Sequence, residues 1–350
     1  MNDRVFRFAG AIAFACLLVL LFDSGARAWE TEGLRLRGRL HGRWELEEDP
    51  AEAGYWSETF RLRRARVDGR WEPENWLRLM LELELTDGVR ARDVYGRLQP
   101  LPLLQITAGR FKKPFSRLKM SSPFNLVIPE RGLLDRYAVA DTYYGGYGGR
   151  DIGIMLSGAY EGPVKLRYYL GAFNNPLDEN EYHRDYVARL QIRIIKGLLL
   201  AGNLSYKRYE TFDFGETRQG DGVLVGGDLR WSIGDFRAQL EGAWGDHLGT
   251  EGGLVDYVNL ARGNSLYGVH SIFSWRFRIT DTLALIPAFM AEVFDPSDER
   301  QDDTAVRLAG ALNADLAKYI RMVLFAEGVL RKAAQYDTPT AVFLQLQLDF

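Results

Sequence analysis

Basic residues gather at two places in the first third of the chain, and both patterns fit the binding of anions. Between residues 35 and 43 arginine fills four of the five alternate positions, and the segment 110–119 has five basic residues and no acidic one. Arginine presents a planar fork for two-point contact with a phosphate or carboxylate, whereas lysine acts as a compact charge. The candidate anion-binding residues in these two runs are Arg35, Arg37, Arg39, Arg43, Arg110, Lys112, Lys113, Arg117 and Lys119.

The first basic run alternates with apolar residues, which is the pattern of a β-strand with one dry face and one wet face. Leu34, Leu36, Leu40 and Trp44 fall on the face opposite the arginines. Successive side chains of a strand point to opposite sides. Since several arginines on one face need water around them, we expect this strand to separate an apolar medium from an aqueous one.

The same alternation recurs along the chain after residue 33 and predicts about sixteen strands. In the second strand the alternation slips by one residue near Arg63, which places Arg64 and Arg66 on the wet face. The expected strands are 34–46, 58–71, 77–85, 94–98, 104–108, 152–160, 164–172, 186–194, 198–206, 223–233, 236–244, 267–277, 283–293, 306–316, 320–330 and 342–350.

The joins between these strands alternate in length. Short joins are expected at 72–75, 161–163, 196–197, 234–235 and 280–281, and long ones at 47–57, 110–149, 173–183, 207–221, 245–264 and 294–303. Strands that are apolar outside and polar inside, with short turns at one end and long loops at the other, are typical of outer-membrane barrels. The predicted fold class is therefore all-β, a transmembrane antiparallel β-barrel of about 16 strands, wide enough to hold an aqueous channel.

The segment 110–149 is too long for a hairpin turn, and we expect it to fold into the barrel and narrow the channel. Long loops without regular structure in compact folds are usually functional or disordered. Its basic side chains, with Arg131, would then face the permeating ions and favour anions. In the alternative interpretation these cations decorate an outer loop and bind anionic lipid headgroups.

The first 28 residues are typical of a secretory signal peptide. Arg4 and Arg7 precede the apolar run 8–22, and Ala26-Arg27-Ala28 has the spacing of small residues found at cleavage sites. The alternative, a membrane anchor, would need a run of about 20 apolar residues. We therefore expect cleavage near Ala28, a barrel domain over 29–350 and export to the outer membrane. The one cysteine, Cys16, would leave with the leader.

No pattern in the chain predicts catalysis. It has four histidines, His41, His183, His247 and His270, and neither a Gly-x-Ser-x-Gly nor a His-Glu-x-x-His sequence. The glycine-rich stretch 145–149 resembles a nucleotide-binding loop only weakly, because no helical pattern follows it. We expect no enzyme activity, no metal, no cofactor and no nucleic-acid partner.

Several short motifs resemble the phosphate-selective porin O and P family. Its G-x-F-K-x-P-F-S pattern matches Gly109–Ser116, and a serine pair (Ser121-Ser122), Glu130-Arg131 and Gly149–Gly153 follow in the family's order. Arg61–Arg66 is similar to the family's second strand, and the terminal Phe350 to the outer-membrane assembly signature. The resemblance implies a trimeric porin of sixteen strands that passes anions such as phosphate. It assigns anion guidance to the matching positions Arg64, Arg66, Arg110, Lys112 and Arg131.

The leading hypothesis is an outer-membrane porin for passive diffusion of small hydrophilic solutes, with a preference for anions. Its expected partners are outer-membrane lipids, permeating anions, two further copies of the chain, and the assembly machinery that recognises the strand ending at Phe350. The second hypothesis is a non-selective channel, or a non-conducting structural or adhesive barrel. It stays open because residues 34–119 hold 18 basic against 13 acidic residues, whereas residues 120–350 hold 23 against 30.

Overall fold

The computed structural model describes residues 29–31, 33–48, 55–140, 146–174, 184–213, 216–246, 265–298, 303–331 and 340–350. The leader expected over 1–28 lies outside these residues, as do His183 and His247. Most of the long joins expected at 173–183 and 245–264 lie outside them too.

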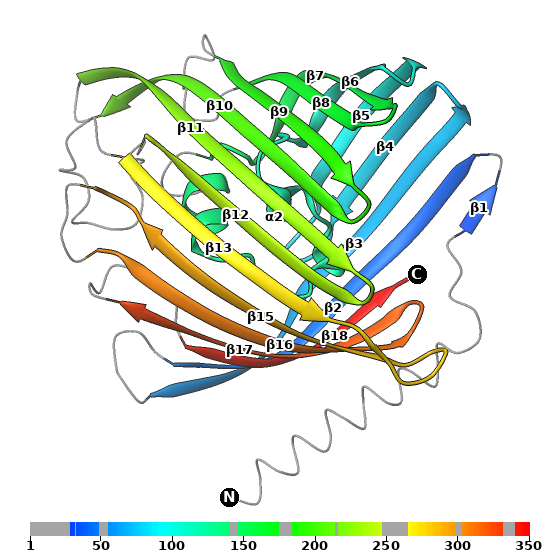
Figure 1. The fold of residues 1–350 in the computed structure, drawn as a ribbon, viewed down its shortest axis with the longest axis vertical. Coiled ribbons are helices and arrows are strands. Elements are labelled where there is room, and N and C mark those ends of the chain that lie inside the picture. The colour runs from blue at the N-terminus through cyan, green and yellow to red at the C-terminus, as the bar shows by residue number, and fades with distance from the viewer. Residues whose placement is uncertain are drawn as a thin grey trace, which may run out of the picture.

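Sixteen long antiparallel strands form one closed sheet (Figure 1), which confirms the predicted fold class. Closure is made by β18, which pairs with β2 over its whole length. Two short pieces, β1 (Trp29–Thr31) and β14 (Phe277–Arg278), extend the sheet at its edge. The long strands are β2 (Leu34–Glu48), β3 (Trp56–Glu74), β4 (Leu77–Glu84), β5 (Arg90–Leu101), β6 (Leu104–Lys112), β7 (Arg150–Glu161), β8 (Lys165–Asn174), β9 (Arg184–Ile195), β10 (Leu198–Asp213), β11 (Glu216–Ile233), β12 (Phe236–Asp246), β13 (Ser265–Trp275), β15 (Ala284–Asp295), β16 (Ala305–Ala317), β17 (Ile320–Arg331) and β18 (Ala341–Asp349).

The two faces of the sheet divide by polarity as the alternation predicts. In β4, Leu79 and Leu81 are exposed on the outer wall, whereas Glu82 and Glu84 are buried on the inner side. The same division runs around the barrel, because leucine, isoleucine, valine and aromatic side chains are exposed on strands all around it. Such an outer wall matches lipid, and the inner wall matches water or a polar filling.

The predicted slip in β3 is a β-bulge. His41 pairs with Arg64 and Gly42 pairs with Leu62, so that Arg63 is the extra residue. A bulge moves all later side chains to the opposite face. As a result Leu62 is exposed on the outer wall, and Arg64 is buried inside.

Two of the expected joins differ from the structure. The ladder of β10 and β11 continues to the pair Asp213 and Glu216, so the loop expected at 207–221 is a long hairpin instead. The hydrogen-bonded ladder extends each strand although the local sequence is polar and glycine-containing. Likewise β6 continues through Lys112, which shortens the expected loop at its start, whereas β7 begins at Arg150, directly after the expected end of the loop.

Of the remaining connection, residues 113–140 and 146–149 fold into the barrel, and we call them the inserted loop (Figure 1). It contains α2 (Arg117–Met120), the 3-10 turn η1 (Pro123–Asn125) and the π-helical turn η2 (Asp135–Val139). None of the helices in the described part of the chain is long or apolar enough to cross a bilayer.

The core of the molecule lies between this loop and the inner wall. One apolar cluster joins Phe115, Leu134 and Tyr137 of the loop to wall residues such as Phe294. A second cluster joins Leu118 and Ile128 to β13, β15, β16, β17 and β18. Wall glycines make room for this packing: a Cβ at Gly268 would lie 3.0 Å from Leu134 Cδ1. The loop is therefore packed against the wall and held inside the barrel.

Candidate functional site

Two wall carboxylates hold the inserted loop by its backbone. Glu241 of β12 accepts hydrogen bonds from the backbone N–H groups of Arg117 and Leu118, at 3.0 and 3.1 Å. Glu292 of β15 accepts two more from Leu133 and Leu134, both at 2.8 Å. All four donors belong to the first residues of helical turns, where N–H groups lack partners within the turn. Both carboxylates are buried, so these contacts fix the height of the loop in the barrel.

Side chains from β16 and β17 attach the middle of the loop. Asn313 Nδ2 donates to the carbonyl of Val127 at 2.9 Å, and Arg321 Nη1 donates to the carbonyl of Phe124 at 2.8 Å. These contacts bring η1 across the lumen toward the last strands of the barrel. The loop thus spans the interior instead of following one wall.

Glu130 is the loop's charged anchor on the nearby strands β2 and β3. Arg43 Nη2 of β2 donates to Glu130 Oε1 at 2.6 Å, and Arg63 Nε lies 3.6 Å from the same oxygen. Burial alone would raise the pKa of Glu130, but the guanidinium groups of Arg63, Arg43 and Arg64 outweigh burial and lower this pKa below its usual range. Glu130 is therefore an anion that stays ionised between several cations.

The start of the loop is tied to the wall by a buried cluster of two lysines and a carboxylate. Lys113 and Lys207 both donate to Asp185 Oδ2, and all three side chains are fully buried. The Lys113 ammonium also lies 3.6 Å from Asp151. Near the other end of the loop, the Tyr147 hydroxyl donates to the carbonyl of Asp246 at 2.8 Å. These cations serve attachment, because none of them faces open space.

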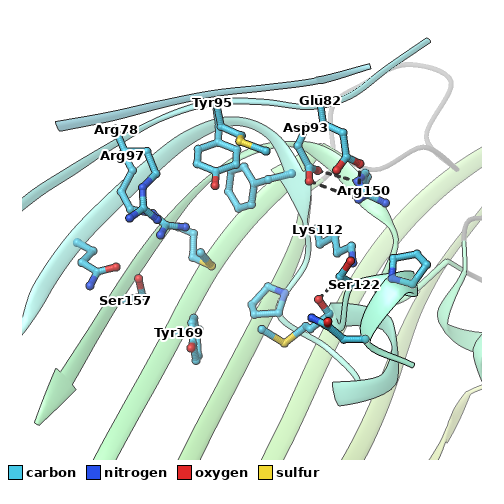
Figure 2. Close-up of a pocket in the computed structure, with 18 of the residues that line it drawn as sticks. Arg78, Glu82, Asp93, Tyr95, Arg97, Lys112, Ser122, Arg150, Ser157 and Tyr169 are labelled. Carbon is cyan, nitrogen blue, oxygen red and sulfur yellow. Dashed lines mark hydrogen bonds and ion pairs between the residues drawn. The ribbon is translucent and has the colours of Figure 1, made fainter. Parts of the chain in front are cut away.

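A first cavity of about 770 Å³ lies between the inserted loop and strands β2–β8, which we call the basic wall. Its lining includes eight basic and three acidic residues. Figure 2 shows Arg78 and Arg97 side by side in this cavity, and Arg150 held by Asp93 and Glu82 at its far end. The charged lining consists of Arg37, Arg39, Arg66, Arg78, Arg97, Lys112, Arg150 and Arg167 with Glu82, Asp93 and Asp349.

Arginines face one another across the basic wall. The register pairs Arg43 with Arg61, Arg39 with Arg66, and Arg35 with Arg70 between β2 and β3, and Arg78 with Arg97 between β4 and β5. Like charges directly opposite in a sheet repel one another unless anions lie between them.

Wall carboxylates compensate these pairs unevenly. Asp68, Glu82 and Glu84 form ion pairs with Arg39 and Arg66. The Arg78 guanidinium has Glu72 at 2.5 Å. Among the described residues, no carboxylate forms an ion pair with Arg97, the partner of Arg78 in the register.

A second cavity of about 340 Å³ lies on the other side of η1, and Asn125 lines both cavities. It borders strands β11–β17 near the short turns. Its charged lining has five arginines and one aspartate: Arg117, Arg230, Arg237, Arg276, Arg321 and Asp235. The loop therefore separates two spaces that both carry an excess of positive charge.

The structure distributes the twelve candidate residues over different environments. Arg37, Arg39, Arg66 and Lys112 line the first cavity, and Arg117 lines the second. Arg43 and Arg64 surround Glu130, and Lys113 is buried with Asp185. Arg35 is exposed on β2 and lines neither cavity.

The remaining three candidates contact the loop itself or lie on the outer wall. Arg131 donates to the carbonyls of Leu118 and Ser121, both at 3.1 Å, and Lys119 lies 4.0 Å from Asp135. Arg110 pairs with Val94 and Ile152, whose exposed side chains place it on the outer face of β6.

Several lining residues escaped the sequence analysis. These residues come from separate strands or, for Arg276, from the link between β13 and β14, and none of them belongs to the two basic runs: Arg97, Arg150, Arg167, Arg230, Arg237, Arg276 and Arg321. Their positions on the wet face were the available signal. In the described residues no group of His, Cys, Asp or Glu side chains is arranged to hold a metal ion.

Comparison with known proteins relates this fold to bacterial outer-membrane porins. No protein-family model matches the sequence, and no curated protein matches it. Among solved structures, Salmonella typhi OmpF in complex with daunomycin is 10% identical, with a TM-score of 0.65 over 92% of this chain and 99% of that chain.

Two further solved structures match over similar lengths. The anion-selective porin from Comamonas acidovorans is 13% identical, with a TM-score of 0.62 over 91% and 99% of the two chains. OmpT of Vibrio cholerae in its trimer form is 11% identical, with a TM-score of 0.60 over 91% and 99%. At such low identity these likenesses establish the fold.

Proposed function

We propose that this protein is an outer-membrane porin through which small hydrophilic solutes diffuse passively, with a preference for anions. The observation that carries the proposal is the excess of arginine in both cavities beside the inserted loop. Rings of arginine and lysine at a narrow point favour anions, because the walls there exclude bulk water and strengthen the field.

The acidic second half of the chain does not oppose this preference. Its buried carboxylates hold cations or the loop: Asp185 binds Lys113 and Lys207, Asp228 binds Arg189, and Glu327 binds Arg307. Glu241 and Glu292 accept backbone N–H groups. A permeating ion therefore passes few carboxylates of this half of the chain that lack a cation or an N–H group as partner.

The proposed path has no chemical step. Anions enter from the side of the long loops, pass the inserted loop beside Asn125, and leave between the arginines near the short turns. No energy source is needed, because the solute moves down its own gradient.

Planar-bilayer recording tests the proposal. The purified protein should give discrete conductance steps. In a gradient of potassium chloride, the reversal potential should have the sign of a channel that passes chloride more readily than potassium. Absence of steps after verified insertion would overturn the porin assignment. Steps with a potassium preference would overturn the anion preference alone.

A pair of variants tests which arginines set the preference. Replacing Arg230 and Arg237 in the second cavity by glutamine (R230Q/R237Q) should move the reversal potential toward zero. Arg110→Gln is the matched control, because Arg110 lies on the outer face of β6. An equal shift in the control would contradict the proposed path.

The proposal extends to the maturation and assembly of the chain. Cleavage after Ala28 should give Trp29 as the first residue of the exported protein, which N-terminal sequencing would establish. A homotrimer should migrate at three times the mass of one chain after cross-linking in detergent. Removal of Phe350 should slow insertion by the assembly machinery.

A further inference from the structure

The first cavity has an apolar side that inorganic anions do not need. Tyr95, Phe111 and Tyr169 line it together with Met80, Met120 and Met155. Tyr95 packs edge-on against Phe111, with ring centroids 5.8 Å apart. A cavity of about 770 Å³ has the size of sites for small organic ligands, and here aromatic and thioether side chains lie beside the charged lining.

Arg97 is the best-placed cation in this cavity. Its Nε donates to Thr107 Oγ1 at 3.1 Å, and its guanidinium carbon lies 5.4 Å from the centroid of the Tyr95 ring. Among the residues that the structure describes, no carboxylate forms an ion pair with Arg97. The two Nη atoms are therefore available, and the hydrogen bond to Thr107 fixes the orientation of the fork.

Arg78 stands directly opposite Arg97 in the β4–β5 register. Only its Nε is engaged by Glu72, at 2.5 Å. Two guanidinium groups in this arrangement repel each other, and an anion between them removes the repulsion. Figure 2 shows both side chains beside Tyr95, extending toward the space bordered by Ser157 and Tyr169.

We propose that this cavity is a binding site for aromatic carboxylates on their way through the channel, an inference that rests on the proposed porin function. The carboxylate lies between Arg97 and Arg78, with two parallel hydrogen bonds from the Arg97 fork. The flat ring packs among Tyr95, Tyr169 and the methionine side chains. Thioether sulfur is soft and adapts to aromatic rings of different shape.

Inorganic phosphate fits this place less well. Phosphate gains nothing from the aromatic and thioether surface, and it must give up a larger hydration shell than a singly charged carboxylate. Most other cations of the cavity are occupied: Arg150 by Asp93 and Glu82, Arg39 by Asp68, and Arg66 by Glu84. A single-charge headgroup with an apolar body matches the Arg97 fork, beside an Arg78 whose Nε is held by Glu72.

Current recordings with a series of anions test the inference without any variant. Benzoate, acetate and inorganic phosphate are added in turn to single channels in potassium chloride. Benzoate should interrupt the chloride current with an apparent Kd at least about 10-fold lower than that of acetate. Equal blockade by benzoate and acetate, or tighter blockade by phosphate, would overturn the aromatic-carboxylate site.

Two variants locate the effect. Arg97→Gln should weaken benzoate blockade about 10-fold, and Tyr95→Leu should weaken benzoate without changing acetate. Arg237→Gln removes one charge from the second cavity and should leave the ratio of benzoate to acetate as in the unmodified protein. A loss of this ratio in Arg237→Gln would place the site elsewhere.

The two proposals fail separately. A protein that inserts but gives no conductance steps refutes the porin function. A protein that conducts chloride normally but does not distinguish benzoate from acetate refutes only the binding site. Calorimetric titration of the detergent-solubilised protein with benzoate gives a second readout, in which absence of binding heat would also refute the site.

Discussion

The basic wall (β2–β8) presents arginine side chains to the first cavity, whereas the docking wall (β9–β18) presents glutamate side chains to the inserted loop. The basic wall points Arg37, Arg78 and Arg97 into open space. The docking wall points Glu241 and Glu292 at backbone N–H groups of the inserted loop, and buries them there. Cations thus remain available to solutes on one wall, while carboxylates are occupied by the loop on the other.

The difference shows that the net charge of a segment does not predict the field in the lumen. A carboxylate that accepts two backbone N–H groups in a buried site is compensated locally by helical-turn dipoles. An arginine that faces another arginine near the short turns is not compensated in this way. The acidic second half of the chain is therefore compatible with an anion-preferring channel.

The largest effect should come from breaking the docking wall. Changing both Glu241 and Glu292 to glutamine replaces four charge-assisted hydrogen bonds, which contribute about 1.5–3 kcal/mol each. The loop should then leave its position, and single-channel conductance should rise at least about 2-fold. A 2-fold rise corresponds to a lowering of the free-energy barrier to permeation by only about 0.4 kcal/mol. Glu161→Gln, at an exposed turn pair with Lys165, is the control and should leave conductance unchanged.

The next largest effect should distinguish the lipid-facing from the cavity-facing side chains of the basic wall. Leu81→Arg puts a charge on the lipid side and should lower the free energy of unfolding by about 2–4 kcal/mol. Met80→Arg, one residue earlier, faces the first cavity and should cost much less. Denaturant titration in lipid vesicles measures both, and equal losses would contradict the assignment of faces.

A smaller effect should follow from crowding the contact between loop and docking wall. Gly268→Val adds side-chain atoms where a Cβ already lies 3.0 Å from Leu134 Cδ1, and overpacking costs about 1–3 kcal/mol. Thermal unfolding should occur at a lower temperature. Gly310→Val is the matched control, because a Cβ there has no atom within 4 Å. Similar losses in the two variants would show that the loop does not pack at Gly268.

The smallest effect concerns pH. The pKa of Glu130 is lowered in the folded protein, so its stabilising contribution is complete above its unfolded value of about 4.3 and is lost only as the pH falls through the lower folded value. The Arg43–Glu130 anchor should therefore give no conductance transition between pH 7 and about 4.5. A transition near pH 5 that disappears in Glu130→Gln would contradict the Arg43–Glu130 anchor.

The strands were predictable from sequence because their signal is local. Each of the sixteen expected segments overlaps a long strand, since a period of two is set by neighbouring residues alone. Even the bulge at Arg63 was visible as a break in the alternation. The side of the wall on which Arg110 lies was not predictable, because the expected loop begins at residue 110, whereas β6 continues through Lys112.

The docking of the loop was not predictable, because its contacts join distant parts of the chain. Leu133 and Glu292 are 159 residues apart, and Arg117 and Glu241 are 124 apart. No local pattern marks a glutamate as the future acceptor of a backbone N–H group. The lining arginines were missed for a related reason, since they are single residues on many strands and converge only when the barrel closes.

Closure between β2 and β18 sets the order in which this molecule can be completed. Arg43 and Gln345, which meet across that seam, are 302 residues apart, and the last backbone hydrogen bond joins Phe350 to Gly38. During synthesis one edge of β2 has no partner strand until β18 has been made. Such an edge readily pairs with other chains. A factor that covers this edge of β2 until β18 pairs with it would therefore protect the protein from aggregation. A chain truncated before β18 could not close the barrel.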